Sequence, residues 1–368
     1  MKTLKIKDIC DKGSSTLKQK DVEGKSGKYP VYGASGYISS IDSYHQDKDY
    51  IAIVKDGSGI GRVSFMPAYS SVIGTMQYIL PKAGYNIKYI AYCLQSLDLS
   101  KYKQGAAIPH IYFRDYGERL IKVEENLVEQ ERIVSLLDLE FAKIDAIKAN
   151  AEKQLQDAKD LLNKSISELT KFQYGWNRIK LKELCSIVGE YGLNESATIF
   201  NGVRYLRITD ISVNGELNNE KVSADHKEGK VQAKLETGDI LFARTGATVG
   251  KTLVYKEEFG DCNFAGYLIR YRTNPNIILP QYLFYYTHSS RYYDRVSKNQ
   301  AVAAQPNISA QKYNGLEIDF PVSIEEQRII VNKLDSLSEN VKQLQSNYEQ
   351  TITLCNDLKQ SILKDIFG

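Results

Sequence analysis

The sequence predicts an α+β protein that contains two copies of one unit, each a globular domain followed by a long helix. Three observations support this prediction. Residue patterns recur in the same order in both halves of the 368-residue chain, and two long runs contain neither glycine nor proline. Tyrosine-rich, net-positive blocks also alternate with acidic blocks that contain almost no tyrosine.

The internal repeat is clearest where the two long runs begin. Glu129-Gln130 and Glu326-Gln327 are followed at equal spacing by the same apolar residues and an aspartate. This offset of 197 also pairs Pro109 with Pro306, Ile111 with Ile308, Tyr116 with Tyr313 and Asp138 with Asp335. At smaller offsets, Cys10 matches Cys185, Gly57 matches Gly246, Gly61 matches Gly250, and 89–92 matches 282–285. The order is kept while the offset grows, so the halves differ by insertions in loops.

The runs without glycine or proline extend from Glu118 to Tyr174 and from Val322 to Phe367. Such runs predict long helices because they lack the residues that usually interrupt one. In the second run, apolar residues alternate at spacings of four and three, which is a heptad pattern and predicts a coiled-coil seam. The seam comprises Ile330, Leu334, Leu337, Val341, Leu344, Tyr348, Cys355, Leu358 and Ile362, with Thr351 in the same series. The first run is less regular, and its obvious partner is the second helix of the same chain.

Each globular part mixes strands with short helices. Residues 50–54 and 239–243 are apolar runs that lead into glycine-rich turns, which is typical of buried strands. Residues 62–65 and 251–255 are predicted to be the return strands. Residues 87–96 and 279–289 are predicted to form short amphipathic helices.

These features divide the chain into four segments: 1–122, 123–172, 173–320 and 321–368. Their net charges are +7, −4, +2 and −2, which add up to the overall +3. Of the 26 tyrosines, all but Tyr348 lie in the first and third segments, which we expect to be globular. The second and fourth segments are the expected long helices.

Several classes of protein are excluded by the sequence. No apolar run of about 18 residues is present, so we expect no membrane span and a cytoplasmic protein. The five cysteines are scattered, which fits a reducing compartment and excludes a cysteine zinc site. The run 246–252 resembles a phosphate-binding loop but is one residue short between its glycines. No catalytic constellation stands out, and we expect no metal and no enzymatic activity.

The residues around the two glycine turns are the first candidates for binding. Lys55, Ser58 and Arg62 in the first half correspond to Arg244, Thr245 and Lys251 in the second. A turn that combines Arg or Lys, Ser or Thr, and nearby glycine approaches a phosphate or a base edge closely. Basic blocks rich in tyrosine also suit a DNA surface.

With these motifs in order, the chain resembles the DNA-specificity subunit of type I restriction-modification systems. Residues 29–37 and 56–61 are similar to segments of the target-recognition domains of that family. Residues 106–111 and 305–309 resemble its closing segments, and 320–329 resembles the entry into its helix. The first copy departs from the last pattern because Glu124 stands where Pro321 stands in the second copy.

The resemblance implies two target-recognition domains, each reading one half of a split site in double-stranded DNA. It implies that the two long helices pack antiparallel, in a pseudo-twofold molecule whose helices set the distance between the half-sites. It further implies that the helices dock modification subunits, and restriction subunits in a host-defence complex. S-adenosylmethionine, ATP and magnesium are expected on those partners and none on this chain.

The residues expected to contact DNA are the basic and polar ones of the two domains. In the first domain they are Lys55, Ser58, Arg62, Lys101, Lys103 and His110. In the second they are Arg204, Arg207, Arg244, Thr245, Lys251, Lys298 and Gln300. Arginine and glutamine favour bidentate contacts to guanine and adenine, and lysine favours phosphate. The alternative is a coiled-coil scaffold that binds only protein, which salt-sensitive DNA binding by the complex would exclude.

Overall fold

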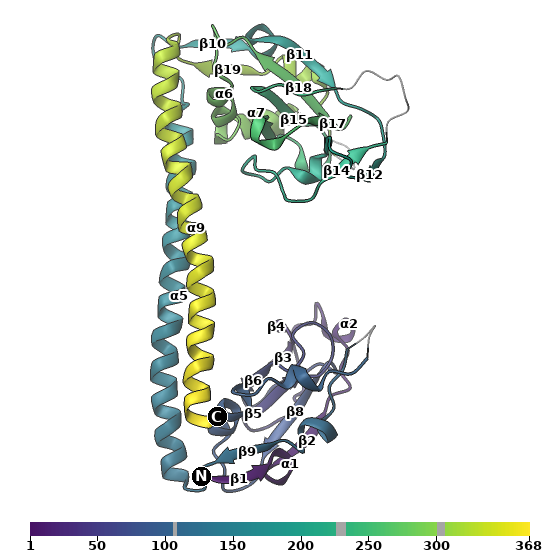
Figure 1. Ribbon diagram of the computed structural model, residues 1–368, viewed down its shortest axis with the longest axis vertical. Helices are drawn as coiled ribbons and strands as arrows, with labels where there is room; N and C mark the ends of the chain where they lie inside the picture. Colours follow the sequence, from purple (N-terminus) through teal and green to yellow (C-terminus); the bar gives the residue numbers. More distant parts are fainter. Residues whose placement is uncertain (106–108, 226–232, 300–305) are drawn as a thin grey trace. The chain divides into compact units, whose positions relative to one another are not determined.

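The computed structural model describes residues 1–105, 109–225, 233–299 and 306–368. The chain forms two compact units: unit 1 holds Met1–Glu152 and Tyr348–Gly368, and unit 2 holds Lys153–Asn347. Each unit contains one globular copy of the repeat and part of both long helices (Figure 1). The four segment limits drawn from the sequence stay predictions.

The globular part of unit 1 is built on a four-stranded antiparallel sheet with strand order β2-β8-β5-β6. Its strands are β2 (Cys10–Ser14), β5 (Tyr50–Val54), β6 (Val63–Met66) and β8 (Met76–Pro81). The central β5 is buried along its whole length, as expected for a continuous apolar run with a neighbour on each side. A second sheet of order β4-β3-β7 consists of β3 (Tyr29–Gly33), β4 (Gly36–Ile41) and β7 (Ser71–Val72).

Short helices and a closing strand pair complete this copy. The strand β1 (Lys2–Lys5) pairs antiparallel with β9 (Leu120–Val123), which leads into the first long helix. The helices are α1 (Ile6–Ile9), α2 (Gln19–Val22), α3 (Ile87–Gln95), the 3-10 helix η1 (Leu99–Tyr102) and α4 (Phe113–Tyr116). The side chain of Asn86 caps α3 by accepting a hydrogen bond from the N–H of Tyr89 at 3.1 Å.

Unit 2 repeats this plan with additions. Its main sheet, of order β11-β18-β15-β16, is formed by β11 (Cys185–Tyr191), β15 (Asp239–Ala243), β16 (Thr252–Val254) and β18 (Leu268–Thr273). Its closing pair is β10 (Asn177–Lys180) with β19 (Glu317–Phe320). Two small sheets pair β12 (Ala197–Ile199) with β14 (Val222–Ala224) and β13 (Arg204–Leu206) with β17 (Cys262–Phe264). The helices are α6 (Pro280–Tyr286), α7 (Ser290–Asn299), α8 (Ala310–Asn314) and the 3-10 turns η2 (Leu181–Leu184), η3 (Ile208–Asp210), η4 (Gly246–Thr248) and η5 (Glu257–Phe259).

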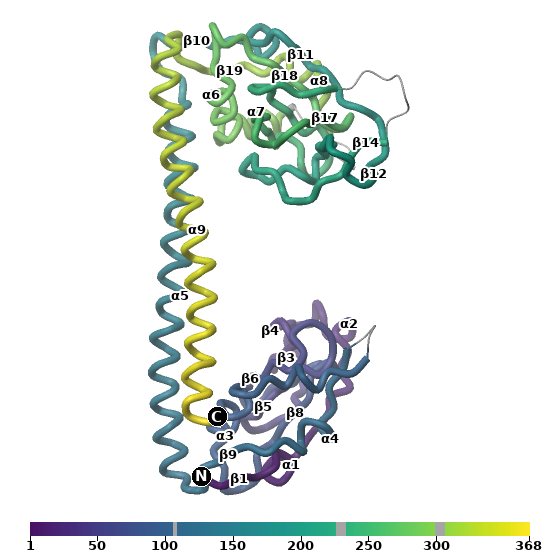
Figure 2. The backbone as a smooth tube through the Cα atoms, viewed as in Figure 1, coloured from purple at the N-terminus to yellow at the C-terminus, as the bar shows by residue number. Residues whose placement is uncertain are grey.

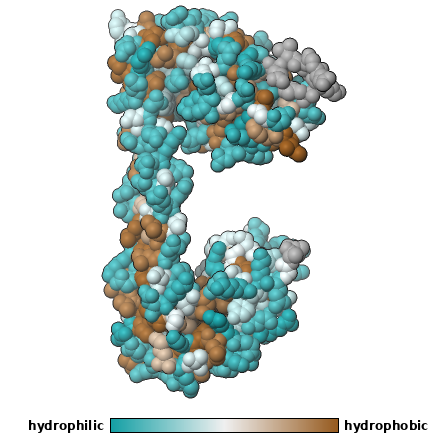
Figure 3. Space-filling model, in the orientation of Figure 1, coloured by the Kyte–Doolittle hydropathy of each residue, from teal (hydrophilic) through white to brown (hydrophobic). Residues whose placement is uncertain are grey.

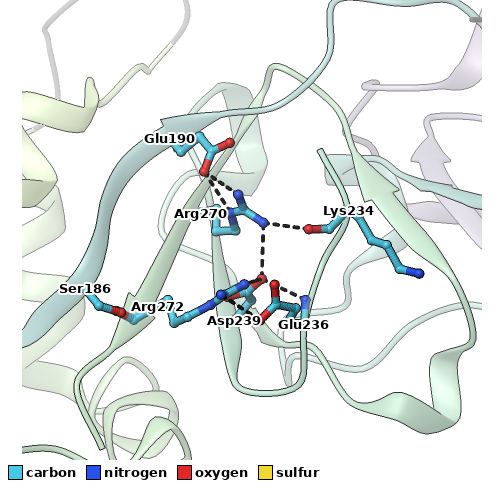
Figure 4. A network of polar contacts seen from close by, with 7 residues as sticks. All are labelled: Ser186, Glu190, Lys234, Glu236, Asp239, Arg270 and Arg272. Atoms are coloured by element: carbon cyan, nitrogen blue, oxygen red, sulfur yellow. Dashed lines mark hydrogen bonds and ion pairs between the residues drawn. The ribbon is translucent and has the colours of Figure 1, made fainter. Parts of the chain in front are cut away.

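A buried carboxylate ties three segments of unit 2 together (Figure 4). Asp239, on β15, is fully buried and accepts hydrogen bonds from Arg272 at 2.6 Å and Arg270 at 3.4 Å, both on β18. Arg270 also donates to the carbonyl of Lys234 at 2.7 Å and to the carboxylate of Glu190 on β11. These pairs fix the register of the sheet and satisfy every charge they bury, which is the condition for burying a carboxylate.

The long helices are α5 (Leu127–Leu169) and α9 (Ile324–Phe367). Within unit 1, Lys359 of α9 pairs with Asp145 of α5 at 2.7 Å, and Lys148 of α5 bonds Asn356 of α9 at 2.6 Å. Residue numbers rise along one helix as they fall along the other, so the helices run antiparallel. Within unit 2, Ile166 of α5 shares a core with Ile330 and Leu334 of α9.

The repeat extends to individual side chains at the start of each long helix. Gln130 is fully buried and accepts a hydrogen bond from the N–H of Asn86 at 2.7 Å while donating to the carbonyl of Glu124 at 2.6 Å. Gln327 does the same in unit 2, accepting from the N–H of Leu279 at 2.9 Å and donating to the carbonyl of Pro321 at 2.9 Å. Both glutamines therefore join a long helix to the short helix of its own copy.

Both chain ends lie in unit 1, beside β9 (Figure 2). The ring of Phe367, the last residue of α9, lies 5.2 Å from the ring of Tyr89 on α3. The ammonium group of Lys122 donates to the carbonyl of Gly368 at 2.8 Å. The end of α9 is thus packed into the globular part of unit 1.

This packing corrects one residue of the predicted seam. Leu358 is 49% exposed, whereas Cys355, Leu363 and Phe367 are buried. Seven residues of an α-helix fall about 20° short of two full turns, so a strict seven-residue seam drifts around a long straight helix. Near its end α9 therefore buries the face of Cys355, Leu363 and Phe367, which contacts the globular part, and Leu358 lies outside it. The predicted seam residues Ile330 and Leu334 are buried, and Leu337, Val341, Leu344, Tyr348 and Ile362 are half-buried.

Over the described ranges, no helix is both long and apolar enough to span a membrane. The same part of the chain contains no group of three or more histidine, cysteine, aspartate or glutamate side chains placed to hold a metal ion.

Candidate nucleic-acid interface

The two glycine turns have the same backbone geometry in both copies. In unit 1 the turn joins β5 to β6, and Gly61 donates to the carbonyl of Val54 at 2.8 Å. In unit 2 it joins β15 to β16, and Gly250 donates to the carbonyl of Ala243 at 3.1 Å. Gly61 and Gly250 have φ of +82° and +87°, the left-handed region that glycine adopts without strain.

Each turn is closed by a segment from much later in its copy. The N–H of Ile111 donates to the carbonyl of Lys55 at 3.0 Å, and the N–H of Ile308 donates to that of Arg244 at 2.9 Å. Ile111 and Ile308 are equivalent under the 197-residue offset, and Lys55 and Arg244 under the 189-residue offset of the glycine turns. The resemblance to family closing segments predicted this region, although 106–108 and 305 lie outside the described residues.

In unit 1 the closing segment brings a histidine and two further side chains to the turn. Nδ1 of His110 contacts the carboxylate of Asp56, and its ring lies 4.2 Å from that of Tyr112. The guanidinium of Arg114 lies 4.5 Å from the same tyrosine ring. Lys55 is half-buried with its ammonium 3.9 Å from Asp56. The structure thus joins Lys55 and His110 through Asp56, and it adds Tyr112 and Arg114, which sequence reasoning missed.

The other first-domain candidates are spread around this turn. Ser58 is exposed at its tip, and the guanidinium of Arg62 donates to the carbonyl of Ala34 at 2.9 Å. Lys101 and Lys103 are exposed on and after η1, with Lys101 3.9 Å from Asp98. The backbone of η1 approaches the turn because a Cβ at Gly61 would lie 2.7 Å from the nitrogen of Ser100.

In unit 2 the guanidinium of Arg244 contacts an aromatic ring and forms no ion pair with the described residues. Its guanidinium lies 5.0 Å from the ring of Tyr191, and its Nε is buried without a hydrogen-bond partner among the described residues. The backbone N–H of Arg244 donates to the carbonyl of Tyr267, a residue that is 59% exposed. Thr245 forms an isolated β-bridge with Asn307, and the buried Oδ1 of Asn307 also lacks a partner in the described part of the chain. Unpaired donors and acceptors beside exposed tyrosines suit the edges of bases.

Two of the predicted DNA contacts already have acceptors inside their own domain. Arg204 is buried and donates to the carbonyls of Asn218 at 2.8 Å and Glu220 at 2.9 Å, so its guanidinium holds β13 to a loop. Arg207 donates to the buried carboxylate of Asp210 at 2.8 Å, and this hydrogen bond raises the pKa of Arg207. Both arginines serve the fold, because each already satisfies acceptors within its own domain.

The remaining candidates of the second domain differ in exposure. Nζ of Lys251 donates to the carbonyl of Ile211 at 3.2 Å, so it is partly committed inside the domain. Lys298 is exposed on α7. Gln300 lies outside the described residues. Tyr191, Tyr267 and Asn307 were missed because only the folded sheet brings them beside Arg244, although their residue types suit nucleic acid.

Two copies of a small α+β domain, each with a basic glycine turn and followed by a long helix, define a protein that presents two related surfaces. A comparison with models of known protein families shows which family has this architecture. The model of the type I restriction modification DNA specificity domain matches residues 1–157 and again 173–354, once for each copy. The chain belongs to this family, and its class is that of the non-catalytic specificity subunits.

Curated relatives agree. The specificity subunit of the type I restriction enzyme StySPI from Salmonella potsdam is 25% identical over 331 residues, covering 83% of this chain and 69% of the relative. That of MjaVIII from Methanocaldococcus jannaschii is 24% identical over 320 residues, 82% and 75% of the two chains. That of EcoBI from Escherichia coli is 23% identical over 293 residues, 72% and 60% of the two chains.

Solved structures show the same fold. A chain from a structure of type I restriction-modification complex assembly and conformational transition has a TM-score of 0.70 at 17% identity, covering 98% of this chain and 96% of that one. The HsdS subunit from Thermoanaerobacter tengcongensis has a TM-score of 0.52 at 17% identity, covering 98% and 95%. The α+β fold with two repeated domains and two long helices is thereby confirmed.

Proposed function

We propose that each globular copy reads one half of a split site in double-stranded DNA through the surface around its glycine turn. The observation that carries this proposal is the equivalent closure of the two turns, Ile111 on Lys55 and Ile308 on Arg244. Because the closures match while the side chains differ, the two copies present the same frame with different donors and acceptors. Such a pair suits a bipartite site whose halves are not identical.

Arg244 is the proposed base-reading residue of the second copy. Its charge is held by Tyr191 alone among the described side chains, so binding to a base breaks no ion pair. A guanidinium fork that binds O6 and N7 of guanine discriminates between bases by about 1–3 kcal/mol. In the first copy, Lys55, His110 and Arg114 take the corresponding place.

The proposed partners of the long helices are methyltransferase subunits, and restriction subunits in the complete complex. In unit 1, apolar side chains remain exposed along both helices, and brown surface gathers there in Figure 3. They include Leu136, Leu139 and Ile147 on α5 and Leu354 and Leu358 on α9. An exposed apolar stripe of this kind favours a helical partner. S-adenosylmethionine, ATP and magnesium are proposed for those subunits, in a cytoplasmic complex.

The reading role is tested by sequencing the methylome of a methylation-free host that expresses the chain with its methyltransferase. Arg244→Lys keeps the charge and removes the fork, so it is expected to relax one half of the methylated motif and leave the other half intact. Lys182→Ala, an exposed lysine in η2, is the matched control and is expected to leave the motif unchanged. An unaltered motif in the Arg244 variant would remove Arg244 from the proposal.

A further inference from the structure

A cleft of about 1040 Å³ opens in unit 1 between the globular part and the long helices. The turn around Arg62 and the segment from Gln95 to Lys101 form one wall, and Asp145 of α5 and Lys364 of α9 belong to the other. Phe141, Leu97 and Leu363 add apolar surface to the lining. The cleft therefore combines an apolar part with charged edges, as protein-binding sites do.

The charge of this cleft is positive. Five basic side chains and two acidic ones line it, namely Arg62, Lys101, Arg119, Lys359 and Lys364 with Asp98 and Asp145. Lys359 pairs with Asp145 at 2.7 Å and Lys101 lies 3.9 Å from Asp98. Within the described ranges, Arg119 and Lys364 have no carboxylate partner. An anionic group in the cleft would meet these two cations first.

The same surface of unit 2 is covered by the chain itself. Under the repeat, Arg62 corresponds to Lys251, Gln95 to His288 and Asp145 to Lys342. Two of these counterparts bind the turn 211–216. Lys251 donates to the carbonyl of Ile211 at 3.2 Å, and Lys342 pairs with Glu216 at 3.2 Å.

The covering turn is compact and fits closely. The N–H of Ser212 donates to the carbonyl of Glu216 at 2.8 Å, and the N–H of Gly215 donates back to Ser212 at 3.2 Å. A Cβ at Gly215 would lie 2.4 Å from the ring of Phe284 and 2.8 Å from the carbonyl of Thr252. The chain between Cys10 and Gly57 is shorter than that between Cys185 and Gly246, and in unit 1 the corresponding place is open.

We propose that the cleft of unit 1 receives an acidic turn from the methyltransferase subunit, in the position that 211–216 occupies in unit 2. As in the intramolecular example, the occupant is a tight polypeptide turn that carries a carboxylate. Asp145 stands in unit 1 where unit 2 has Lys342, so this carboxylate meets other cations of the cleft. Arg119 and Lys364 supply the unpaired positive charge, and the half-buried Leu97 supplies apolar contact. The proposal rests on the proposed assembly with a methyltransferase, and it is independent of which bases the chain reads.

The test uses the purified complex of the full-length chain with its methyltransferase subunit. Arg119→Glu combined with Lys364→Glu is expected to weaken assembly by about tenfold or more and to flatten its salt dependence. Lys20→Glu combined with Lys25→Glu, two exposed lysines of unit 1 outside the cleft, is the matched control and is expected to assemble normally. The neutral pair Arg119→Gln and Lys364→Gln gives the intermediate loss and replaces the reversal variant if that variant does not fold.

A photo-crosslinking residue in place of Ser100, which lines the cleft, identifies the occupant in the same complex. A crosslink to a methyltransferase segment that contains aspartate or glutamate supports the proposal. Normal assembly of the charge-reversal variant, a crosslink to DNA alone, or no association of the wild-type chain with this subunit overturns it. Failure of DNA reading gives a different result, because the complex then assembles and crosslinks while no split motif is methylated.

Discussion

The hydroxyl of Tyr92 on α3 donates a hydrogen bond of 2.5 Å to the carboxylate of Asp138 on α5. The equivalent pair in unit 2, Tyr285 on α6 and Asp335 on α9, has a distance of 2.6 Å. Each globular copy is therefore clamped to its own long helix by the same tyrosine and aspartate. Because the tyrosine and the aspartate occupy matching places in both halves of the sequence, the repeat extends to the contact between each domain and its long helix.

Removing the clamp hydroxyl is expected to destabilise each unit. Tyr285→Phe leaves Asp335 without its donor and is expected to cost about 1.5–3 kcal/mol, the range for a hydrogen bond to a charged group. Tyr92→Phe is expected to cost less, because Tyr92 is half-buried whereas Tyr285 is buried. Hydrogen exchange of the α3 and α6 amides measures both, with the fully exposed Tyr174→Phe as the control. Equal protection in all three variants would contradict the clamp.

The clamp in unit 1 is expected to depend on pH. Burial opposes ionisation of Asp138, but hydrogen bonds from Tyr92 and Lys88 outweigh it and lower the pKa of this carboxyl below its ordinary 3.8. The stabilisation is present above that ordinary value and is lost as the pH falls through the lowered folded pKa. Hydrogen exchange of the α3 amides is expected to accelerate as the pH falls through this window. Asp138→Asn is expected to remove the part of this pH dependence that comes from Asp138. Identical profiles in the variant and the wild type would rule out Asp138 as the titrating group.

Asp239 is expected to be the most sensitive single charge in unit 2. Asp239→Asn leaves the buried Arg270 and the neighbouring Arg272 without their shared carboxylate, at a cost of about 3–5 kcal/mol. Glu236→Gln is the matched control, since Glu236 also pairs with Arg272 but its side chain is 68% exposed. That exposed pair is expected to contribute about 0–1 kcal/mol. Urea unfolding followed by a unit 2 probe measures both, and similar losses would contradict the assigned roles.

Alanine variants of Arg204 and Arg244 are expected to have different effects, the first on the stability of the fold and the second on DNA binding. Arg204→Ala leaves two backbone carbonyls unpaired and is expected to cost about 1–3 kcal/mol. Arg244→Ala removes no ion pair and is expected to leave the unfolding free energy within about 0.5 kcal/mol while weakening DNA binding. Thermal unfolding and salt-dependent DNA binding of the assembled complex measure the two effects. The reverse assignment, with Arg244 structural and Arg204 reading, would appear as the opposite pattern.

The sequence predicts the strands around each turn and the long helices because local periodicity determines them. The central strands 50–54 and 239–243 and the repeat of Gln130 and Gln327 follow from apolar runs and from equal spacing. Leu358 departs from the predicted seam because helical drift is small per heptad and accumulates with length. Periodicity gives the existence of the seam but not its phase at the end of the helix.

The candidate site was harder to predict because its charges look alike in a sequence. Arg204, Arg207 and Arg244 are all arginines in a basic block, and only their partners distinguish them. Asn218 binds Arg204, and Asp210 binds Arg207. Tyr191 reaches Arg244 from β11, which β18 separates from β15 in the sheet. Contacts between segments that are distant in the chain therefore decide which cation is available to a ligand.

The most direct test of the account is the methylome of a methylation-free host that expresses this chain together with its methyltransferase. The account predicts a new methylated motif in two separated halves, absent when the chain is omitted, with Arg244→Lys altering only one half. A motif without a gap, or no new methylation although the two subunits form a folded complex, would contradict the claim that the two copies read two half-sites.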